Sequence, residues 1–271
     1  MSPNQKVILI TGASSGVGQA TARLLSREGH RVFGTSRNPA SAEAIPGVQM
    51  VALDVRFDDS VAACLRAVGV ESRRIDILVN NAAYELAGAI EEISVDEAKA
   101  QFETNFFGVI RMVKAVLPYM RRQKQGQIIN VSSLSGVSSI PFMGIYSASK
   151  FALEGYTEAL RLEVSPLNIH VSLTEAGFLK TPMMSKRQVS AVQLNEYNPS
   201  RQRAFNAIRE HEQKAPGPES VSETILRIIG SKKPQLRYVI GRQAKFATSL
   251  QRFLPEAAYE WGKRTTFRLD K

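Results

Sequence analysis

Cysteine is nearly absent from this chain, with Cys64 as the only one among 271 residues. One cysteine cannot close a disulfide within the chain, which excludes a disulfide-stapled secreted fold, and its place in a helical apolar pattern favours a buried structural thiol. Long apolar runs are absent too. Residues 1–6 are polar and lead directly into a strand pattern, and no segment has signal-peptide or membrane-spanning character. We therefore expect a soluble, cytoplasmic protein.

Histidine is also scarce, at three residues. No cysteines and histidines cluster at metal-ligand spacing, so no metal site is expected. The scarcity argues against a hydrolase, although residues 12–16 match the Gly-x-Ser-x-Gly elbow in which Ser14 would be the nucleophile. A hydrolase needs a later histidine as base, but His170 falls inside an expected strand and His211 falls in an irregular stretch.

Acidic residues are too few to balance the basic ones, and the net charge is +10. Residues 1–179 are neutral overall, whereas residues 180–214 carry +4 and residues 231–271 carry +7. We favour a solvated basic face as the interpretation. Attraction of an anionic substrate and contact with an acidic membrane surface stay as alternatives. Nothing beyond this charge indicates nucleic-acid recognition.

Short β-rich runs alternate with helical patterns along most of the chain. Near-continuous apolar strands that alternate with helices are typical of a parallel sheet covered on both faces. Strands are expected at residues 6–11, 31–35, 48–53, 75–79, 127–132, 169–174 and 237–240, and helices at 17–28, 57–68, 96–122 and 146–164. The prediction is a single doubly wound α/β (Rossmann) domain over residues 1–271, with a parallel sheet of about seven strands and helices on both faces.

The alternation fails between Pro182 and Pro218, in a polar and basic stretch with room for short helices. This stretch is too long for a plain connection, so residues 178–217 are expected to form a substrate lid within the domain. Residues 231–271 are expected to form a basic C-terminal extension. From Lys245 its apolar residues follow a helical spacing, which favours a helix packed on the body or on a second subunit over a membrane-surface helix.

A glycine-rich turn closes the first expected strand and opens the first expected helix. Its Gly-x-x-x-Gly-x-Gly spacing differs by one residue from the usual dinucleotide fingerprint. Glycines let the backbone turn tightly and approach a pyrophosphate, and the helix N-terminus then offers free N–H groups to the phosphates. The turn residues expected to bind a dinucleotide are Gly12, Ser14, Ser15, Gly16, Val17 and Gly18.

The end of the second expected strand indicates which dinucleotide binds. An acidic residue at this place selects the 2′-hydroxyl of NAD, whereas an arginine suits the 2′-phosphate of NADP. Here the strand ends in Ser36 and Arg37, and the next acidic residue is Glu43. The sequence therefore predicts NADP(H), with a solvated turn residue as the alternative interpretation of Arg37.

Tyr146 and Lys150 lie four residues apart, on one face of an expected helix. A phenol has a pKa near 10, and an adjacent ammonium is expected to lower it toward use at neutral pH. Tyr259 and Lys263 repeat this spacing and are assigned no role. What distinguishes Tyr146 is Ser133, which follows the fifth expected strand at the edge where open α/β sheets bind ligands.

With these motifs the sequence resembles the short-chain dehydrogenase/reductase family over about residues 5–182. The resemblance implies a role for several residues that the spacing alone would not single out. Asp54 matches a residue that contacts adenine, Asn105 one that anchors a relay water, and Thr181 one that contacts the carboxamide. The further cofactor-binding residues that it implies are Val55, Asn81, Ala82 and Gly177.

Two positions depart from the family pattern. In the segment from Asn80 to Ala83, alanine replaces a final glycine, which should matter only if that position needs positive φ. Ala176 replaces a proline before Gly177 and is expected to loosen the hinge of the lid.

The resemblance also implies an activity. Tyr146 would exchange a proton with a carbonyl or alcohol oxygen while NADP(H) exchanges hydride with its carbon. Ser133 would orient the oxygen, Lys150 would bind the nicotinamide ribose, and Asn105 would support a water chain. A non-catalytic NADP(H)-binding sensor or regulatory subunit is the alternative, and the complete Ser133, Tyr146 and Lys150 set argues against it.

The substrate is expected to be an apolar ketone or secondary alcohol, because apolar residues gather in the segments that should wall the pocket. These residues are Leu134, Phe142, Met143, Phe178 and Met183, beside Ser133 and Tyr146. The segment 35–39 and the C-terminal extension look similar to the hydroxysteroid- and retinol-dehydrogenase-like branch. Members of the family pair through the helices that match 96–122 and 146–164, so a homodimer or homotetramer is expected.

Overall fold

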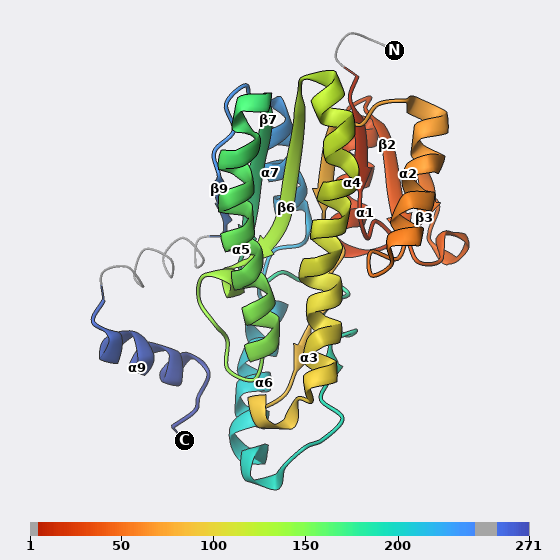
Figure 1. Cartoon of the computed structure of the whole chain (residues 1–271). Helices are drawn as coiled ribbons and strands as arrows, with labels where there is room; N and C mark the ends of the chain where they lie inside the picture. The colour runs from red at the N-terminus through yellow and green to blue at the C-terminus, as the bar shows by residue number, and fades with distance from the viewer. Residues whose placement is uncertain (1–4, 242–253, 271) are drawn as a thin grey trace.

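Seven parallel strands form the centre of the molecule (Figure 1). The computed structural model describes residues 5–241 and 254–270. The sheet order is β3-β2-β1-β4-β6-β7-β9. The strands are β1 (Val7–Ile10), β2 (Arg31–Ser36), β3 (Val48–Ala52), β4 (Ile77–Asn80), β6 (Gly126–Ser133), β7 (Ile169–Ala176) and β9 (Arg237–Ile240). The strand order reverses between β1 and β4, and this confirms the predicted doubly wound fold.

Helices cover both faces of this sheet. On one face α2 (Asp58–Ser72), α4 (Gly108–Gln123) and α5 (Gly144–Val164) share a buried apolar layer with the strands. On the other face α1 (Gly16–Arg27) packs against α7 (Glu219–Gly230) in a second layer. Figure 1 shows α4 and α5 in front of the sheet, with α7 behind it.

The apolar runs of the sequence are explained by this two-sided burial. All four residues of β1 are buried, and they alternate between the two layers. Val7 and Leu9 belong to the layer under α2, α4 and α5, whereas Ile8 and Ile10 belong to the layer under α1 and α7. A strand covered on both faces gains from an apolar side chain at every position, so it shows no alternation with polar residues.

The segment expected to be a lid contains a longer helix than the sequence indicated. Residues 178–217 contain β8 (Gln188–Val189), which pairs in parallel with β5 (Leu86–Ala87), and the 16-residue helix α6 (Asn198–Gln213). The buried positions of α6 follow a helical spacing but include Arg201 and Glu212. Arg201 forms an ion pair with the buried Glu92. Because charged residues occupy this inner face, an apolar pattern does not reveal the helix.

The stretch expected as one helix over 96–122 is divided. It begins as α3 (Val95–Phe102), passes through a π-helical turn at Glu103–Phe107 and continues as α4. π-helical turns occur often at functional sites, and this one holds Asn105.

The C-terminal helix α9 (Glu256–Thr266) is fastened to the loop between β6 and α5. The Tyr259 hydroxyl lies 2.5 Å from the Ser138 hydroxyl, and the Lys263 ammonium donates to the Ser139 carbonyl at 2.5 Å. The second Tyr-Lys pair therefore makes a packing contact.

The expected helix from Lys245 lies outside the described residues. Within residues 5–241 and 254–270, no helix is both long and apolar enough to cross a membrane.

Candidate active site

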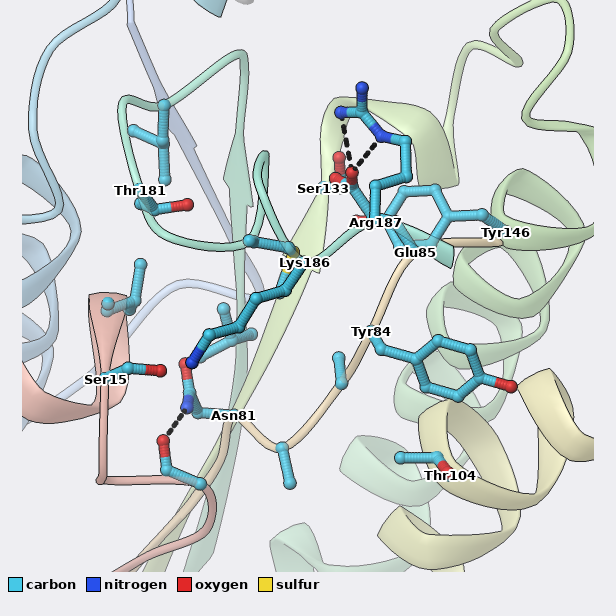
Figure 2. Close-up of a pocket in the computed structure, with 18 of the residues that line it drawn as sticks. Ser15, Asn81, Tyr84, Glu85, Thr104, Ser133, Tyr146, Thr181, Lys186 and Arg187 are labelled. Atoms are coloured by element: carbon cyan, nitrogen blue, oxygen red, sulfur yellow. Dashed lines mark hydrogen bonds and ion pairs between the residues drawn. The ribbon is translucent and has the colours of Figure 1, made fainter. Parts of the chain in front are cut away.

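One cavity of about 650 Å³ opens at the carboxyl ends of β1, β2, β4, β6 and β7 (Figure 2). It brings together most of the residues singled out in the sequence. Its lining includes Gly12, Ser14, Ser15, Gly16, Val17, Ser36, Arg37, Asp54, Val55, Asn81, Ala82, Ser133, Leu134, Met143, Tyr146, Lys150, Gly177, Phe178, Thr181 and Met183. Three of the expected residues, Gly18, Asn105 and Phe142, lie outside this lining.

The glycine turn has the geometry of a phosphate cradle. Gly12 and Gly16 adopt φ angles of 68° and 56°, the left-handed region that favours glycine. Gly18 faces the turn itself, since a Cβ atom there would lie 2.3 Å from the Gly12 carbonyl oxygen. The helix α1 begins at Gly16, so its free N–H groups point at the cavity and suit an anion. These residues fit a dinucleotide pyrophosphate.

The end of β2 offers a cation and no carboxylate. Ser36 and Arg37 line the cavity, and within the described residues no ion pair engages Arg37. Asp54 also lines the cavity, but its carboxylate is held by Arg56, whose Nη2 lies 2.6 Å away. Hydrogen bonds from Arg56 lower the pKa of Asp54. An adenine contact by Asp54 therefore stays an expectation from the family resemblance.

Tyr146, Ser133 and Lys150 meet at the edge of the sheet. Tyr146 lies in the first turn of α5 with only 6% of its surface exposed, and it lines the cavity together with Ser133. Ser133 ends β6, where its Oγ accepts from the Ser135 N–H at 3.1 Å. Lys150 lies one helical turn after Tyr146, with its ammonium 5.9 Å from the centre of the tyrosine ring.

The expectation that Lys150 lowers the pKa of Tyr146 is wrong for this structure. Burial raises the pKa of Tyr146 above its ordinary value, Glu85 adds to the rise, and the Ser133 hydroxyl and the Arg187 cation offset part of it. The Lys150 ammonium donates instead to the Val131 carbonyl at 2.9 Å. Burial lowers the pKa of Lys150 itself to about 8. At neutral pH Tyr146 therefore keeps its proton, as a proton donor must.

Asn105 is buried behind the cavity and does not line it. Its amide group donates to the Tyr84 carbonyl at 3.0 Å and to the Ser149 hydroxyl at 3.2 Å, and its oxygen accepts from the Tyr84 N–H at 3.1 Å. The side chain thus joins the segment after β4 to α5. Its expected role in holding a water stays a prediction.

Leu134, Met143, Phe178 and Met183 line the cavity, as expected, together with the charged residues described below. Phe142 differs, because it packs edge-on against Phe205 at 6.1 Å between ring centroids, away from the lining. The two departures from the family pattern bring no backbone strain. Ala83 and Ala176 both have negative φ angles, so position 83 does not require glycine, and the looser hinge expected at Ala176 stays a prediction.

A buried ion cluster beside Tyr146 was not anticipated from the sequence. Arg187 donates from Nε to Glu85 Oε2 at 2.8 Å and also pairs with Glu212 (Figure 2). All three residues line the cavity. Arg187 stands in the basic stretch interpreted as solvated, yet its side chain is only 13% exposed. No sequence signal joins these partners, because their separations of 25 and 102 residues follow no local period.

Lys186 is a second unanticipated residue. Figure 2 shows its side chain extending toward Asn81 and Ser15, above the glycine turn. The segment that carries it already lies over this turn, since a Cβ atom on Gly16 would sit 3.8 Å from Thr181. The two neighbouring cations thus serve different ends of the cavity: Arg187 faces Glu85, and Lys186 faces the place that suits a pyrophosphate.

A doubly wound sheet with a phosphate turn, and a Ser-Tyr-Lys group at its carboxyl edge, defines an oxidoreductase that uses a nicotinamide dinucleotide. The family described as short chain dehydrogenase matches residues 6–191, and the chain belongs to this family. A 3-ketodihydrosphingosine reductase of Bacteroides thetaiotaomicron is 42% identical over 97% of this chain and 98% of its own length.

Two further relatives place the chain within the family. The human 17-beta-hydroxysteroid dehydrogenase type 1 is 34% identical over 92% of this chain and 79% of its own length. A solved short-chain dehydrogenase from Streptomyces avermitilis superposes with a TM-score of 0.82, at 30% identity, over 99% of this chain and 97% of its own. The expected resemblance to the hydroxysteroid- and retinol-dehydrogenase-like branch is thereby confirmed.

Lys186→Ala is expected to weaken binding of the reduced nicotinamide dinucleotide by about tenfold, because a charge-assisted hydrogen bond to the pyrophosphate is lost. The dissociation constant is measured from the fluorescence of the bound nicotinamide. Lys180→Ala is the matched control, since Lys180 is an exposed lysine of the same segment and does not line the cavity. Equal losses in the two variants would show that only the general charge of the segment matters.

Proposed function

We propose that this protein is an NADP(H)-dependent reductase of a keto group on a long apolar chain. The observation that carries the proposal is the meeting of Ser133, Tyr146 and Lys150 in one cavity, whose lining also includes Leu134, Met143, Phe178 and Met183. Two further facts support it: Arg37 directly follows β2 where an acidic residue would select NAD, and the Bacteroides relative is named for the reduction of 3-ketodihydrosphingosine.

The reaction follows from the protonation states of the site. The bound cofactor supplies a hydride for the carbonyl carbon. Ser133 donates a hydrogen bond to the carbonyl oxygen and orients it, and Tyr146 transfers its phenolic proton to that oxygen. A phenolate left in a buried site is costly, and the Lys150 ammonium one turn away offsets this cost because it is still charged at neutral pH. Proton return from solvent restores Tyr146.

Residues 178–217 are proposed to act as a lid that closes over substrate and cofactor together. The β5–β8 pairing fixes one part of this segment to the wall of the pocket. The Arg187 pairs with Glu85 and Glu212 draw the same segment toward Tyr146.

The cytoplasmic location expected from the sequence also stays a proposal, which cell fractionation would check.

Tyr146→Phe is expected to lower the rate of NADPH oxidation with a long-chain ketone by about a hundredfold or more, because the proton donor is lost. The rate is followed by the loss of NADPH absorbance over ketones graded in chain length, and the longer chains should give the higher kcat/KM. Tyr156→Phe, a tyrosine of the same helix that does not line the cavity, is the control. NADPH binding without turnover of any ketone would favour a sensor over an enzyme.

Arg37→Ala is expected to weaken NADPH binding about tenfold or more and to leave NADH binding nearly unchanged. The reason is that the guanidinium meets only the 2′-phosphate that NADH lacks. Both dissociation constants are measured by calorimetry, with Arg27→Ala, an exposed arginine of α1, as the control. An equal loss of affinity for the two dinucleotides would contradict the assignment of NADP(H).

A homo-oligomer is also proposed, formed through α4 and α5. Phe107, next to α4, and Phe151, on α5, are aromatic residues that stay 43% and 45% exposed on these elements, and Leu162 on α5 is exposed as well. Exposed apolar side chains gathered on two helices are typical of a protein interface. Phe151→Glu is therefore expected to shift the mass in solution, measured by light scattering, toward the monomer. Trp261→Glu on α9 is the control, and an unchanged mass in both variants would overturn this interface.

A further inference from the structure

Two buried glutamates lie behind Lys150, and the chemistry proposed above does not use them. Glu154 follows Lys150 by one turn of α5, and Glu175 lies on β7 opposite Ser132 of β6. The exposed fractions of Glu154 and Glu175 are 5% and 1%. The two carboxyl groups lie against the same side-chain nitrogen, Nε of Arg237.

Arg237 of the edge strand β9 is the cation that meets both carboxyl groups. Its Nε lies 3.2 Å from Glu154 Oε2 and 3.0 Å from Glu175 Oε1, and its Nη2 lies 2.5 Å from Glu158 Oε1. The two buried carboxylates and the exposed Glu158 thus share one guanidinium, so the buried pair is not neutralised by Arg237 alone. Such an excess of negative charge is unfavourable in a buried place, unless a further positive charge or a proton neutralises it.

The hydrogen-bond pattern indicates a missing proton at the same place. Among the described residues, Glu154 Oε1 and Ser132 Oγ are buried without a hydrogen-bond partner, and Glu175 Oε1 has only its ion-pair contact with Arg237. Gly136 closes the space above them, since a Cβ atom there would lie 3.0 Å from both Glu154 Cγ and Ser132 Oγ. One proton held by either carboxyl group would supply a donor to the facing oxygen and remove one negative charge.

We infer that Glu154 and Glu175 are positioning residues that hold one proton between them and keep the Lys150 ammonium charged. Burial supports this, because it raises the pKa of both carboxyl groups, that of Glu175 to about 7. The charged and polar groups around the pair are Lys150 and Glu158 from α5, Ser132 from β6 and Arg237 from β9. Glu85 acts on Lys150 from the opposite side.

The sign of the effect follows from these charges. Below neutral pH the pair holds one proton and carries one negative charge. As the pH rises the proton leaves, the pair carries two negative charges, and the charged form of Lys150 is favoured more strongly. Loss of the pair's proton therefore opposes loss of the Lys150 proton. The inference rests on the role proposed for Lys150.

Glu154→Gln and Glu175→Gln test the inference, because each removes a carboxylate and keeps its shape. In both variants the pH profile of kcat/KM for ketone reduction is expected to fall at a pH about one unit lower than in the wild type. The reason is that the pKa of Lys150 is lower when a carboxylate beside it is removed. Glu158→Gln is the matched control. Glu158 pairs with the same Arg237, but its side chain is 53% exposed, so the profile should stay in place. An unmoved profile in both folded variants, or an equal shift in Glu158→Gln, overturns the inference.

A second measurement separates this inference from the proposed function. The infrared carbonyl band of a protonated carboxylic acid should disappear as wild-type protein is titrated through neutral pH, and it should be missing in Glu175→Gln. This band needs no substrate, so it tests the shared proton even if no ketone is reduced. A wild-type spectrum without the band overturns the shared proton. A normal band in a protein without turnover would overturn only the proposed reaction.

Discussion

At the carboxyl edge of the sheet, the side chain of Asn81 joins the turn after β4 to the glycine turn after β1. Its amide donates to the carbonyl oxygens of Thr11 and Gly12 at 2.9 and 3.0 Å, and the Thr11 hydroxyl accepts the N–H groups of Asn81 and Ala82. These bonds lie where the strand order reverses, so they set the width of the crevice. The position of the phosphate turn, the shape of the pocket and the approach of Lys186 to that turn all depend on these hydrogen bonds.

The core and the motifs were predictable because they follow local rules. A strand buried on both faces, such as β1, is apolar at every position, and the glycine turn needs glycine at its left-handed residues. The ion cluster around Arg187 was not predictable, since its partners are distant in the chain and meet only through the fold. The helix α6 stayed hidden for a related reason, because charged residues on its inner face remove the apolar period.

Burial decides the electrostatics of the site more than any single neighbour does. It raises the pKa of Tyr146 and lowers that of Lys150, whereas the spacing of the two residues indicated only their mutual effect. Sequence spacing gives distance along a helix but not exposure to water. This explains why the expected direction of the pKa shift of Tyr146 was wrong. Residues 178–217, proposed to act as a lid, also show that exposure to water cannot be inferred from the chain alone. Arg187 is enclosed between two carboxylates, although the basic residues around it in the sequence indicate a solvated stretch.

The C-terminal segment that contains α9 packs behind the site. Phe267, just after α9, packs in one buried cluster with Tyr146 and Met143, and the helix fastens the loop at Ser138 and Ser139. The last described residues thus pack behind Tyr146 and Met143 without lining the cavity or contributing to the sheet. Substitutions in this terminal segment would therefore reach Tyr146 through packing, with every residue of the cavity lining left unchanged.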